Sequence, residues 1–267
     1  MKVAVCCIIK EENDYLKEFV EYYKNLGIDN IIIYDNNDSD GEDINDSIKE
    51  YIDTGYVIVV EDKDKEAQQG FAYNDCIAKY GRQYDWICFF DVDEYLTLQK
   101  HDNIKDYLAG FPETCDCIHI NWRCMSDNNL LYNDGRPLIE RFTEAIDKNE
   151  AINNHIKSIV KVTKMNNPYY GNPHYFAGCN ECRLNNGNLC SSYDSFNVPV
   201  NWDDACLTHF VMKTITEFLY KKMKRGTADR TLSNYRNVVS ADSFFSINKR
   251  TPEKEQIITE FINNRKL

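Results

Sequence analysis

The sequence predicts an α/β domain built on a parallel sheet, and two observations lead to this fold class. Apolar segments of strand length alternate with amphipathic segments from residue 2 to residue 90, in the order β-α-β-α-β-α-β. This order favours right-handed crossovers between parallel strands. The length of 267 residues and the 43% hydrophobic content suit a soluble globular protein with one large core.

The elements of this first part follow from local periodicity. Residues 2–9 are apolar throughout, as in a buried parallel strand, and residues 12–26 place apolar side chains at helical spacing before Gly27 ends the helix. The remaining expected elements are, in order, a strand at 30–34, a helix near 43–53, a strand at 56–60, a helix at 67–80 and a strand at 85–90.

The pattern changes after residue 96. A short helix near 102–109 and a strand at 115–121 are expected, and residues 122–200 contain short strands and turns. Helices are expected at 213–225 and 252–264. No internal repeat or low-complexity linker divides the sequence, which favours a single domain.

Composition excludes some classes of function. The net charge of −12 argues against a general nucleic-acid partner. No apolar run approaches the roughly 20 residues that span a membrane, so no integral membrane segment is expected. We expect the N-terminus to form the first strand rather than a signal peptide. Eleven cysteines, an odd number, then favour reduced thiols in a cytoplasmic protein.

Asp91-Val92-Asp93 is the most specific feature, because it directly follows the apolar segment 86–90. Residues i and i+2 of a strand point to the same side, so both carboxylates can face one cation. Mg²⁺ and Mn²⁺ prefer oxygen ligands, and open α/β sheets bind ligands at the carboxyl ends of their strands. The alternative is an acidic turn, since Asp is common after strands.

The usual glycine-rich phosphate motifs are missing from the sequence. The first strand is followed by Lys10-Glu11-Glu12-Asn13, with no G-x-G-x-x-G, and no Walker A motif occurs. A nucleotide would therefore be held by side chains and a metal ion.

The ordered motifs resemble the GT-A glycosyltransferases of the family 2-like and family 92-like groups. The stretches that carry this resemblance are residues 10–16, 34–40, 69–74, 85–96 and 209–226. The resemblance implies a single GT-A domain over residues 1–267, a Rossmann-like nucleotide-diphospho-sugar transferase with a mixed central sheet. Residues 1–96 would then be the nucleotide-binding half, 97–212 the acceptor-facing half, and 213–267 the C-terminal helices.

Site residues are implied by the same resemblance. Asp91, Asp93 and His209 would hold Mn²⁺ or Mg²⁺, although a lone histidine is more often structural. The residues expected to contact the donor are Lys10, Glu11, Asp35, Asn36, Asn37, Gln69, Asn74, Asp91, Lys213 and Arg225. For Asn36 and Asn37 an Asx-turn role is equally favoured.

The catalytic base is the weakest assignment. An inverting transfer needs a carboxylate that takes the proton of the acceptor hydroxyl. Asp127 is preferred slightly over Glu181 and Asp203. For each of the three, the alternative is an ordinary surface acid with no catalytic role. Relatives show Trp-x-x-Phe-Gly where this chain has Trp122-Arg123-Cys124-Met125-Ser126-Asp127. Because of this difference, the resemblance does not identify the acceptor.

The expected activity is metal-dependent transfer of a sugar, a hexosyl group, from a nucleotide-diphosphate donor to a glycan or lipid-linked acceptor. UDP is the first choice of nucleotide, and inversion is implied by the resemblance. The expected setting is polysaccharide assembly in a bacterial cytoplasm. Peripheral contact with the inner membrane is compatible with this expectation. The alternatives are a non-catalytic nucleotide- or glycan-binding module and a phosphatase of the haloacid-dehalogenase type. The phosphatase is disfavoured because its acidic motif normally ends the first strand, whereas this one ends the fourth.

A cysteine motif suggests a second metal. Cys179-Asn180-Glu181-Cys182, with His174 and Cys190 nearby, offers zinc ligand types. Free thiols are the simpler interpretation, because a second close pair is missing.

Overall fold

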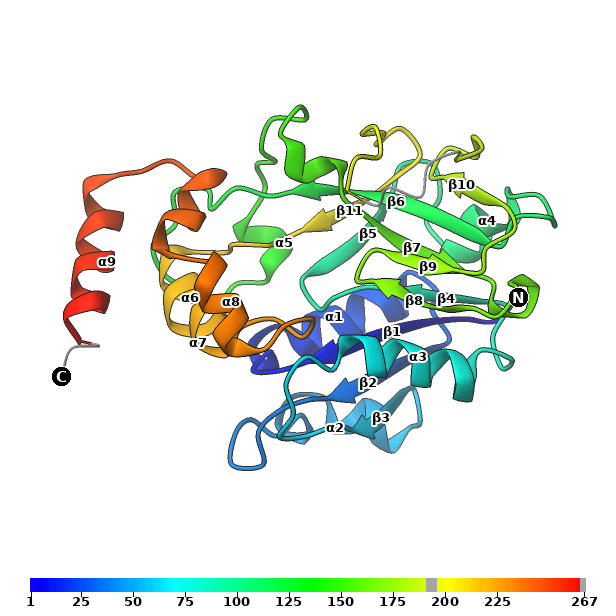
Figure 1. The fold of residues 1–267 in the computed structure, drawn as a ribbon, viewed down its shortest axis with the longest axis horizontal. Coiled ribbons are helices and arrows are strands. Elements are labelled where there is room, and N and C mark those ends of the chain that lie inside the picture. Colours follow the sequence, from blue (N-terminus) through cyan, green and yellow to red (C-terminus); the bar gives the residue numbers. More distant parts are fainter. Residues whose placement is uncertain (191–195, 265–267) are drawn as a thin grey trace.

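A nine-stranded mixed sheet forms the centre of the computed structural model, which describes residues 1–190 and 196–264 (Figure 1). Its strands are β1 (Val3–Ile9), β2 (Asn30–Asp35), β3 (Val57–Glu61), β4 (Trp86–Phe89), β5 (Glu94–Leu98), β6 (Cys117–Cys124), β7 (Ile156–Val160), β10 (Cys182–Leu184) and β11 (Ala205–His209). The order along the sheet is β3-β2-β1-β4-β7-β6-β11-β5, and β10 pairs with β6. A separate hairpin consists of β8 (Tyr169–Asn172) and β9 (Tyr175–Ala177).

The helices of the described residues are α1 (Asn13–Asn25), α2 (Asn45–Asp53), α3 (Gln69–Tyr80), α4 (Ile104–Ala109), α5 (Leu138–Arg141), α6 (Ile215–Glu217), α7 (Met223–Arg225), α8 (Leu232–Val238) and α9 (Pro252–Asn264). Helices α1 and α3 pack near the first strands of this sheet, whereas α6 to α9 gather at one end of the molecule (Figure 1). Short 3₁₀ turns lie at Ala151–Asn154, Val162–Lys164 and Ala241–Ser246. None of the helices in the described part is long and apolar enough to cross a membrane.

The first four strands are parallel, which confirms the predicted α/β class. β1 pairs with β2 and β4, and β2 pairs with β3, in each case in parallel register. The side chains of β1 alternate between two cores: Val5 packs on the α1 side of the sheet, and Cys6 packs on the α3 side. The carboxyl ends of these strands therefore meet at one edge of the sheet.

The second half makes the sheet mixed, as the resemblance implied. β7 is antiparallel to both of its neighbours, β4 and β6, whereas β11 is parallel to β6 and antiparallel to β5. β5 was not among the expected elements. Its partner β11 comes far later in the chain, so the nearby sequence shows little of this pairing.

The helix expected at 213–225 is interrupted. Lys213 has a positive φ of 56°, and the helix begins only at Ile215, after a capping box between Thr214 and Glu217. A π-helical turn at Phe218–Lys222 then separates α6 from α7. Such wide turns are frequent at functional sites, and this one ends at Lys222, which lines the cavity described in the next section.

Candidate active site

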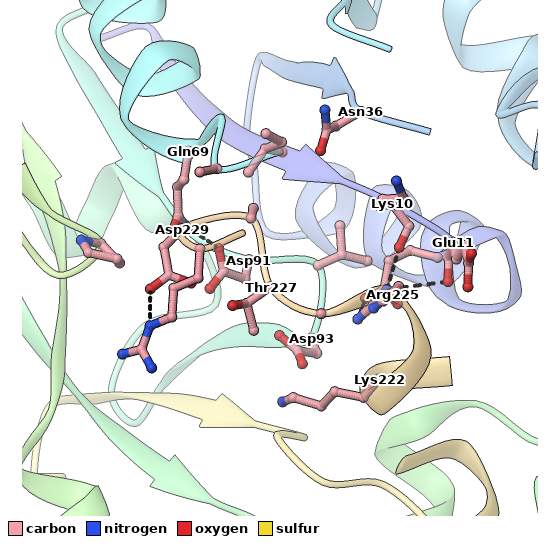
Figure 2. Close-up of a pocket in the computed structure, with 18 of the residues that line it drawn as sticks. Lys10, Glu11, Asn36, Gln69, Asp91, Asp93, Lys222, Arg225, Thr227 and Asp229 are labelled. Carbon is pink, nitrogen blue, oxygen red and sulfur yellow. Dashed lines mark hydrogen bonds and ion pairs between the residues drawn. The ribbon is translucent and has the colours of Figure 1, made fainter. Parts of the chain in front are cut away.

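A cavity of about 370 Å³ lies at the carboxyl ends of β1, β2 and β4, and we call it the main cavity (Figure 2). The segment after α7, including Thr227 and Asp229, forms another part of its wall. Eight of the expected site residues line it, namely Lys10, Glu11, Asn36, Gln69, Asp91, Asp93, His209 and Arg225. Residues far apart in the sequence are thus brought to a single concave site of the kind that binds small molecules.

Asp93 and His209 are brought together by strand pairing. In the β5–β11 register His209 lies opposite Glu94, and the Phe210 backbone N–H donates to the Asp93 carbonyl oxygen at 2.9 Å. The Asp93 carboxylate lies 3.5 Å from His209 Nε2 and 3.6 Å from Lys213 Nζ. The two ligand types therefore face each other at the cavity wall.

Neighbouring charges favour the ionised form of Asp93, and burial favours the neutral form of His209. Burial raises the pKa of the Asp93 carboxyl, but Lys213 and His209 lower it more, so that this pKa lies well below its usual range. Burial lowers the pKa of His209 more than Asp93 raises it, which leaves a neutral imidazole at pH 7. Buried His209 Nδ1 has no hydrogen-bond partner among the described residues.

The Asp93–His209 pair fits a divalent cation. A carboxylate oxygen and an imidazole nitrogen 3.5 Å apart can both turn to one ion, since ligand distances of about 2.0–2.2 Å place adjacent ligand atoms about 3 Å apart. A mixed oxygen and nitrogen set of this kind suits Mn²⁺.

Asp91 occupies a different environment. Lys157 Nζ donates to its Oδ2 at 2.7 Å, while Gln69 and Tyr73 donate to its Oδ1 at 3.2 and 3.3 Å. The Asp91 N–H donates to the Glu94 carboxylate at 2.8 Å, which closes the acidic turn. Asp91 is therefore fixed by protein donors, and Asp93 remains the carboxylate with the looser contacts.

Lys157 was not found from the sequence. It is fully buried on β7, where burial lowers its pKa but Asp91 and Glu94 raise it more, giving a net increase. The available signal was a single charged residue within the otherwise strand-like segment 156–160. A buried lysine needs a carboxylate partner, and that requirement could have directed attention to the acidic turn.

The cationic side of the main cavity contains Lys10, Lys222 and Arg225. Lys10 pairs with Asp38 at 2.5 Å, and Arg225 pairs with Glu12 and donates to the Lys10 carbonyl oxygen. Lys222 donates to the Val211 carbonyl oxygen, and no carboxylate of the described residues lies within 4.0 Å of its ammonium. Lys224 also lines the cavity without such a partner among the described residues, but it is exposed, so the half-buried Lys222 is the better candidate to meet an added anion (Figure 2).

Lys213 differs from Lys222 in position. It lies beside Asp93 and 4.0 Å from Glu12, and it lines a small neighbouring depression instead of the main cavity. The expectation that Lys213 contacts the donor stays a prediction that this position does not support.

The Asp35-Asn36-Asn37 turn is held largely by its own hydrogen bonds. Asp35 Oδ1 accepts from the Asn37 backbone and side chain, at 3.1 and 2.7 Å, in an Asx turn. Asn37 Oδ1 in turn accepts from the Glu11 N–H at 2.8 Å. Only Asn36 of this turn lines the main cavity, and Asn74 instead accepts from the Tyr170 N–H at 2.8 Å. Asp35, Asn37 and Asn74 thus support the site's framework.

The three acids considered for the base lie outside the main cavity. Asp127 is buried against Lys254 of α9 and lines a separate depression. Glu181 pairs with Arg183 at 2.7 Å beside β10, and Asp203 is exposed in the loop before β11. All three acids therefore lie away from a donor bound in the main cavity, and the identity of the base stays a prediction.

The mixed sheet and the acidic turn at the end of its fourth strand define a GT-A glycosyltransferase fold. The sequence pattern of glycosyltransferase family 92 matches residues 1–178, and the chain belongs to this family.

The similar curated proteins are family 92 proteins of plants. One from Ricinus communis is 32% identical over 107 residues, covering 39% of this chain and 19% of the relative. One from Oryza sativa subsp. japonica is 27% identical over 112 residues, covering 41% and 18%. The matched part spans about a fifth of the length of these relatives. Their plant origin gives no support to a bacterial setting.

Among solved structures, S. aureus TarS has a TM-score of 0.44 at 12% identity, covering 98% of this chain and 71% of that chain. TarS has also been solved with UDP and with UDP-GlcNAc. The mannosyltransferase PcManGT from Pyrobaculum calidifontis, in complex with GDP-Man and Mn²⁺, has a TM-score of 0.34 at 11% identity, covering 57% and 49%. Because these scores are below 0.5, the fold assignment depends on the sheet and on family membership.

Proposed function

We propose that this protein transfers a sugar from a nucleotide-diphosphate donor bound in the main cavity, with a divalent cation, Mn²⁺ or Mg²⁺, held by Asp93 and His209. One observation carries the proposal: the carboxylate–imidazole pair of Asp93 and His209 lines the same cavity as Lys222, whose ammonium has no carboxylate of the described residues within 4.0 Å. Opposite charges placed in this way suit a metal ion and a diphosphate together.

Each group would have a distinct part in binding the donor. When bound, the cation would neutralise the charge that develops on the leaving nucleoside diphosphate. Lys222 would donate to a phosphate oxygen, and the Lys10 and Arg225 side chains would add positive potential nearby. Asp91 is held in one orientation by Lys157 and keeps free lone pairs for a ribose hydroxyl.

The remaining details are proposals from the family resemblance. UDP is the first choice of nucleotide, the acceptor is a glycan or a lipid-linked glycan, and the transfer inverts the anomeric centre. A bacterial cytoplasmic setting in polysaccharide assembly is retained only as a proposal. We do not propose Asp127, Glu181 or Asp203 as the base, because each lies outside the main cavity.

Titration calorimetry with UDP and GDP, with and without Mn²⁺, tests the binding part. We expect nucleotide binding that needs the metal, a strong loss in Asp93→Ala, and wild-type behaviour in the matched surface variant Asp102→Ala. Equal nucleotide affinity in wild type and Asp93→Ala would overturn the metal role.

Turnover of UDP-, GDP- and CDP-sugars, alone and with glycan acceptors, tests the reaction. Nucleotide release is expected for at least one donor. Metal-dependent binding without any release would favour the non-catalytic module. A phosphoryl group trapped on Asp91, together with phosphatase activity, would favour the haloacid-dehalogenase alternative.

A further inference from the structure

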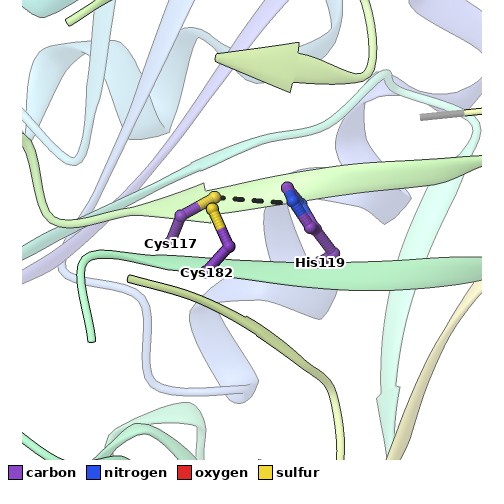
Figure 3. Close-up of side chains that lie close together, drawn as sticks. All are labelled: Cys117, His119 and Cys182. Carbon is purple, nitrogen blue, oxygen red and sulfur yellow. Dashed lines mark hydrogen bonds between the residues drawn. The ribbon is translucent and has the colours of Figure 1, made fainter. Parts of the chain in front are cut away.

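We propose that Cys117, His119, Cys179 and Cys182 form a structural zinc site, separate from the main cavity. Cys117 and His119 lie two residues apart on β6, so their side chains point to the same face (Figure 3). β10 runs parallel to β6 with Cys182 directly opposite Cys117. Sheet register therefore brings three ligands from two strands together.

The distances suit one small cation. Single ligand atoms of Cys117, His119 and Cys182 all lie within 4.8 Å of one another, and Cys117 Sγ is 3.8 Å from His119 Nδ1. Four ligands arranged tetrahedrally about zinc, with Zn–S near 2.3 Å, place neighbouring sulfur atoms about 3.8 Å apart. The three side chains are thus near coordinating positions already.

Cys179 supplies the fourth ligand. Its thiol interacts with those of Cys117 and Cys182, and because it lies outside the group of three atoms within 4.8 Å of one another, a side-chain rotation would bring it to the ion. It also donates to the Phe176 carbonyl oxygen at 3.4 Å, a weak contact that a metal bond would replace. Cys179 and Cys182 form a C-x-x-C pair, the usual spacing of two zinc ligands on one turn.

The C-x-x-C turn is held in place by a neighbour outside the ligand set. The Asp116 carboxylate accepts from the Asn180 and Glu181 backbone N–H groups at 2.7 and 3.1 Å. Asp116 immediately precedes Cys117, so the same strand that carries two ligands also orients the turn that carries the other two. The turn is therefore preorganised for coordination.

The ligand chemistry selects zinc over the cation proposed for the main cavity. Three thiolates and an imidazole are a soft set that leaves no open position in a tetrahedral site, which is typical of structural zinc. Cys117 and His119 are only 0% and 1% exposed, and Cys182 is 8% exposed, whereas half-buried Cys179 gives the ion a path of entry. A disulfide would use two of these thiols and would give the imidazole no role.

The structure revises the ligand set considered from the sequence. Cys179 and Cys182 remain, but His174 borders the main cavity, and its Nδ1 bonds to the Ile156 carbonyl oxygen at 2.8 Å. The Cys190 backbone N–H donates to the Cys182 carbonyl oxygen, which places Cys190 beside the turn, and we assign the fourth position to Cys179 because it shares the C-x-x-C turn with Cys182. The missing second pair, Cys117 and His119, comes from a distant strand.

Zinc would tie a strand that leads to the cavity wall to a segment that packs on the central sheet. β6 leads to Trp122, which lines the main cavity. The segment before the C-x-x-C turn contains Phe176, whose ring packs 4.4 Å from Phe89 and 6.0 Å from Tyr73. A closed zinc site would fix both segments against the central sheet.

Metal analysis of the full chain tests the proposal. The protein, purified without a metal-affinity tag from zinc-supplemented medium, should contain about one zinc ion per chain by mass spectrometry. Cys182→Ser should lose that zinc. Cys190→Ser and Asp93→Asn should keep it. Asp93 lies in the main cavity, so the Asp93→Asn variant tests the zinc site independently of the cation proposed there.

A second measurement avoids dependence on a variant that may fold poorly. Cobalt substituted into the wild type should give intense tetrahedral d–d bands and thiolate charge-transfer bands. The proposal would be overturned if the wild-type protein contained no zinc and its cobalt-treated form lacked these bands. Retention of zinc by Cys182→Ser, or a disulfide among Cys117, Cys179 and Cys182 in place of free thiols, would also overturn it.

Discussion

Two buried charge clusters lie near the start of α1, and they differ in how completely their polar atoms are partnered. In the first, both oxygens of Glu217 accept hydrogen bonds. Arg141 donates to each at 3.0 and 3.1 Å, Tyr15 donates one further bond, and Thr214 donates two, from its backbone N–H and its hydroxyl. In the second, Asp93 meets His209 and Lys213 only at 3.5 and 3.6 Å. Glu12 Oε2 and His209 Nδ1 have no hydrogen-bond partner among the described residues.

The difference separates a structural cluster from a binding one. A buried charge is tolerated when its hydrogen-bonding capacity is satisfied, as at Glu217, where the forked Arg141 joins α5 to α6. The contacts of Asp93 are longer than ordinary hydrogen bonds, which leaves this carboxylate able to bind a cation. Changes in the first cluster should therefore affect stability, and changes in the second should affect binding and turnover.

The largest expected effect comes from Asp93→Asn. Loss of the carboxylate should reduce donor turnover by about 10³-fold, equivalent to about 4 kcal/mol, because the charge that holds the cation is removed. The free energy of unfolding in urea should fall by less than this value of about 4 kcal/mol: Lys213 and His209 stabilise the charge and lower its pKa, but the contacts are long. A larger loss of stability than of turnover would contradict the comparison.

Glu217→Gln should have the opposite profile. Removing the charge leaves Arg141 buried without its partner, so the free energy of unfolding should fall by about 3 kcal/mol in urea titrations. The matched variant Glu50→Gln also removes an ion-paired carboxylate, but from an exposed pair with Lys17, and should cost less than about 0.5 kcal/mol. Equal losses of unfolding free energy in both variants would show that burial does not increase the contribution of the Glu217 cluster to stability.

Lys222→Met should weaken UDP binding by about 10- to 100-fold, the value of about 1.5–3 kcal/mol for a hydrogen bond to a charged group. Lys213→Met should weaken it less, because Lys213 lies outside the main cavity, and the exposed Lys49→Met serves as the control. Calorimetric titrations of the three variants check the order. A stronger effect at Lys213 would restore the assignment made from the sequence.

The smallest effect concerns acid stability. Burial raises the pKa of Glu217, but Arg141, Thr214 and Tyr15 lower it more, so its folded value lies below the ordinary 4.5. The stability that this charge contributes is present in full above the unfolded pKa and is lost as pH falls through the folded value. The stability difference between wild type and Glu217→Gln should therefore be constant near pH 7 and shrink below about pH 4.5. A difference that grows on acidification would contradict this sign.

The first half of the fold could be predicted because each element carries its own signal. β1 and α1, for example, are set by an apolar run and by apolar residues at helical spacing within a few residues of the predicted bounds. β5 could not be found in this way, because its hydrogen-bonding partner β11 lies far along the chain. Local periodicity contains no information on such pairings.

The candidate site divides along the same line. The acidic turn was visible because two carboxylates follow an apolar strand, and family resemblance added His209. The sequence has no comparable signal for Lys157 or for Lys222, because their positions at the site depend on which way each side chain points after the chain has folded. For Lys222, the positive φ at Lys213 and the π-helical turn set that direction, and neither has a clear sequence signal.

The register between β5 and β11 has a consequence for engineering. Asp93 precedes β5 and His209 ends β11, and the segment between them includes β6 and β7, which lie between β4 and β11 in the sheet. Only the loops that connect these strands can therefore be lengthened, shortened or exchanged without moving either side chain. Chimeras that keep the strands and replace one such loop should retain the Asp93–His209 pair while presenting a new surface. The same pairing makes a shift of one residue in β11 intolerable, because it would turn His209 to the opposite face of the sheet.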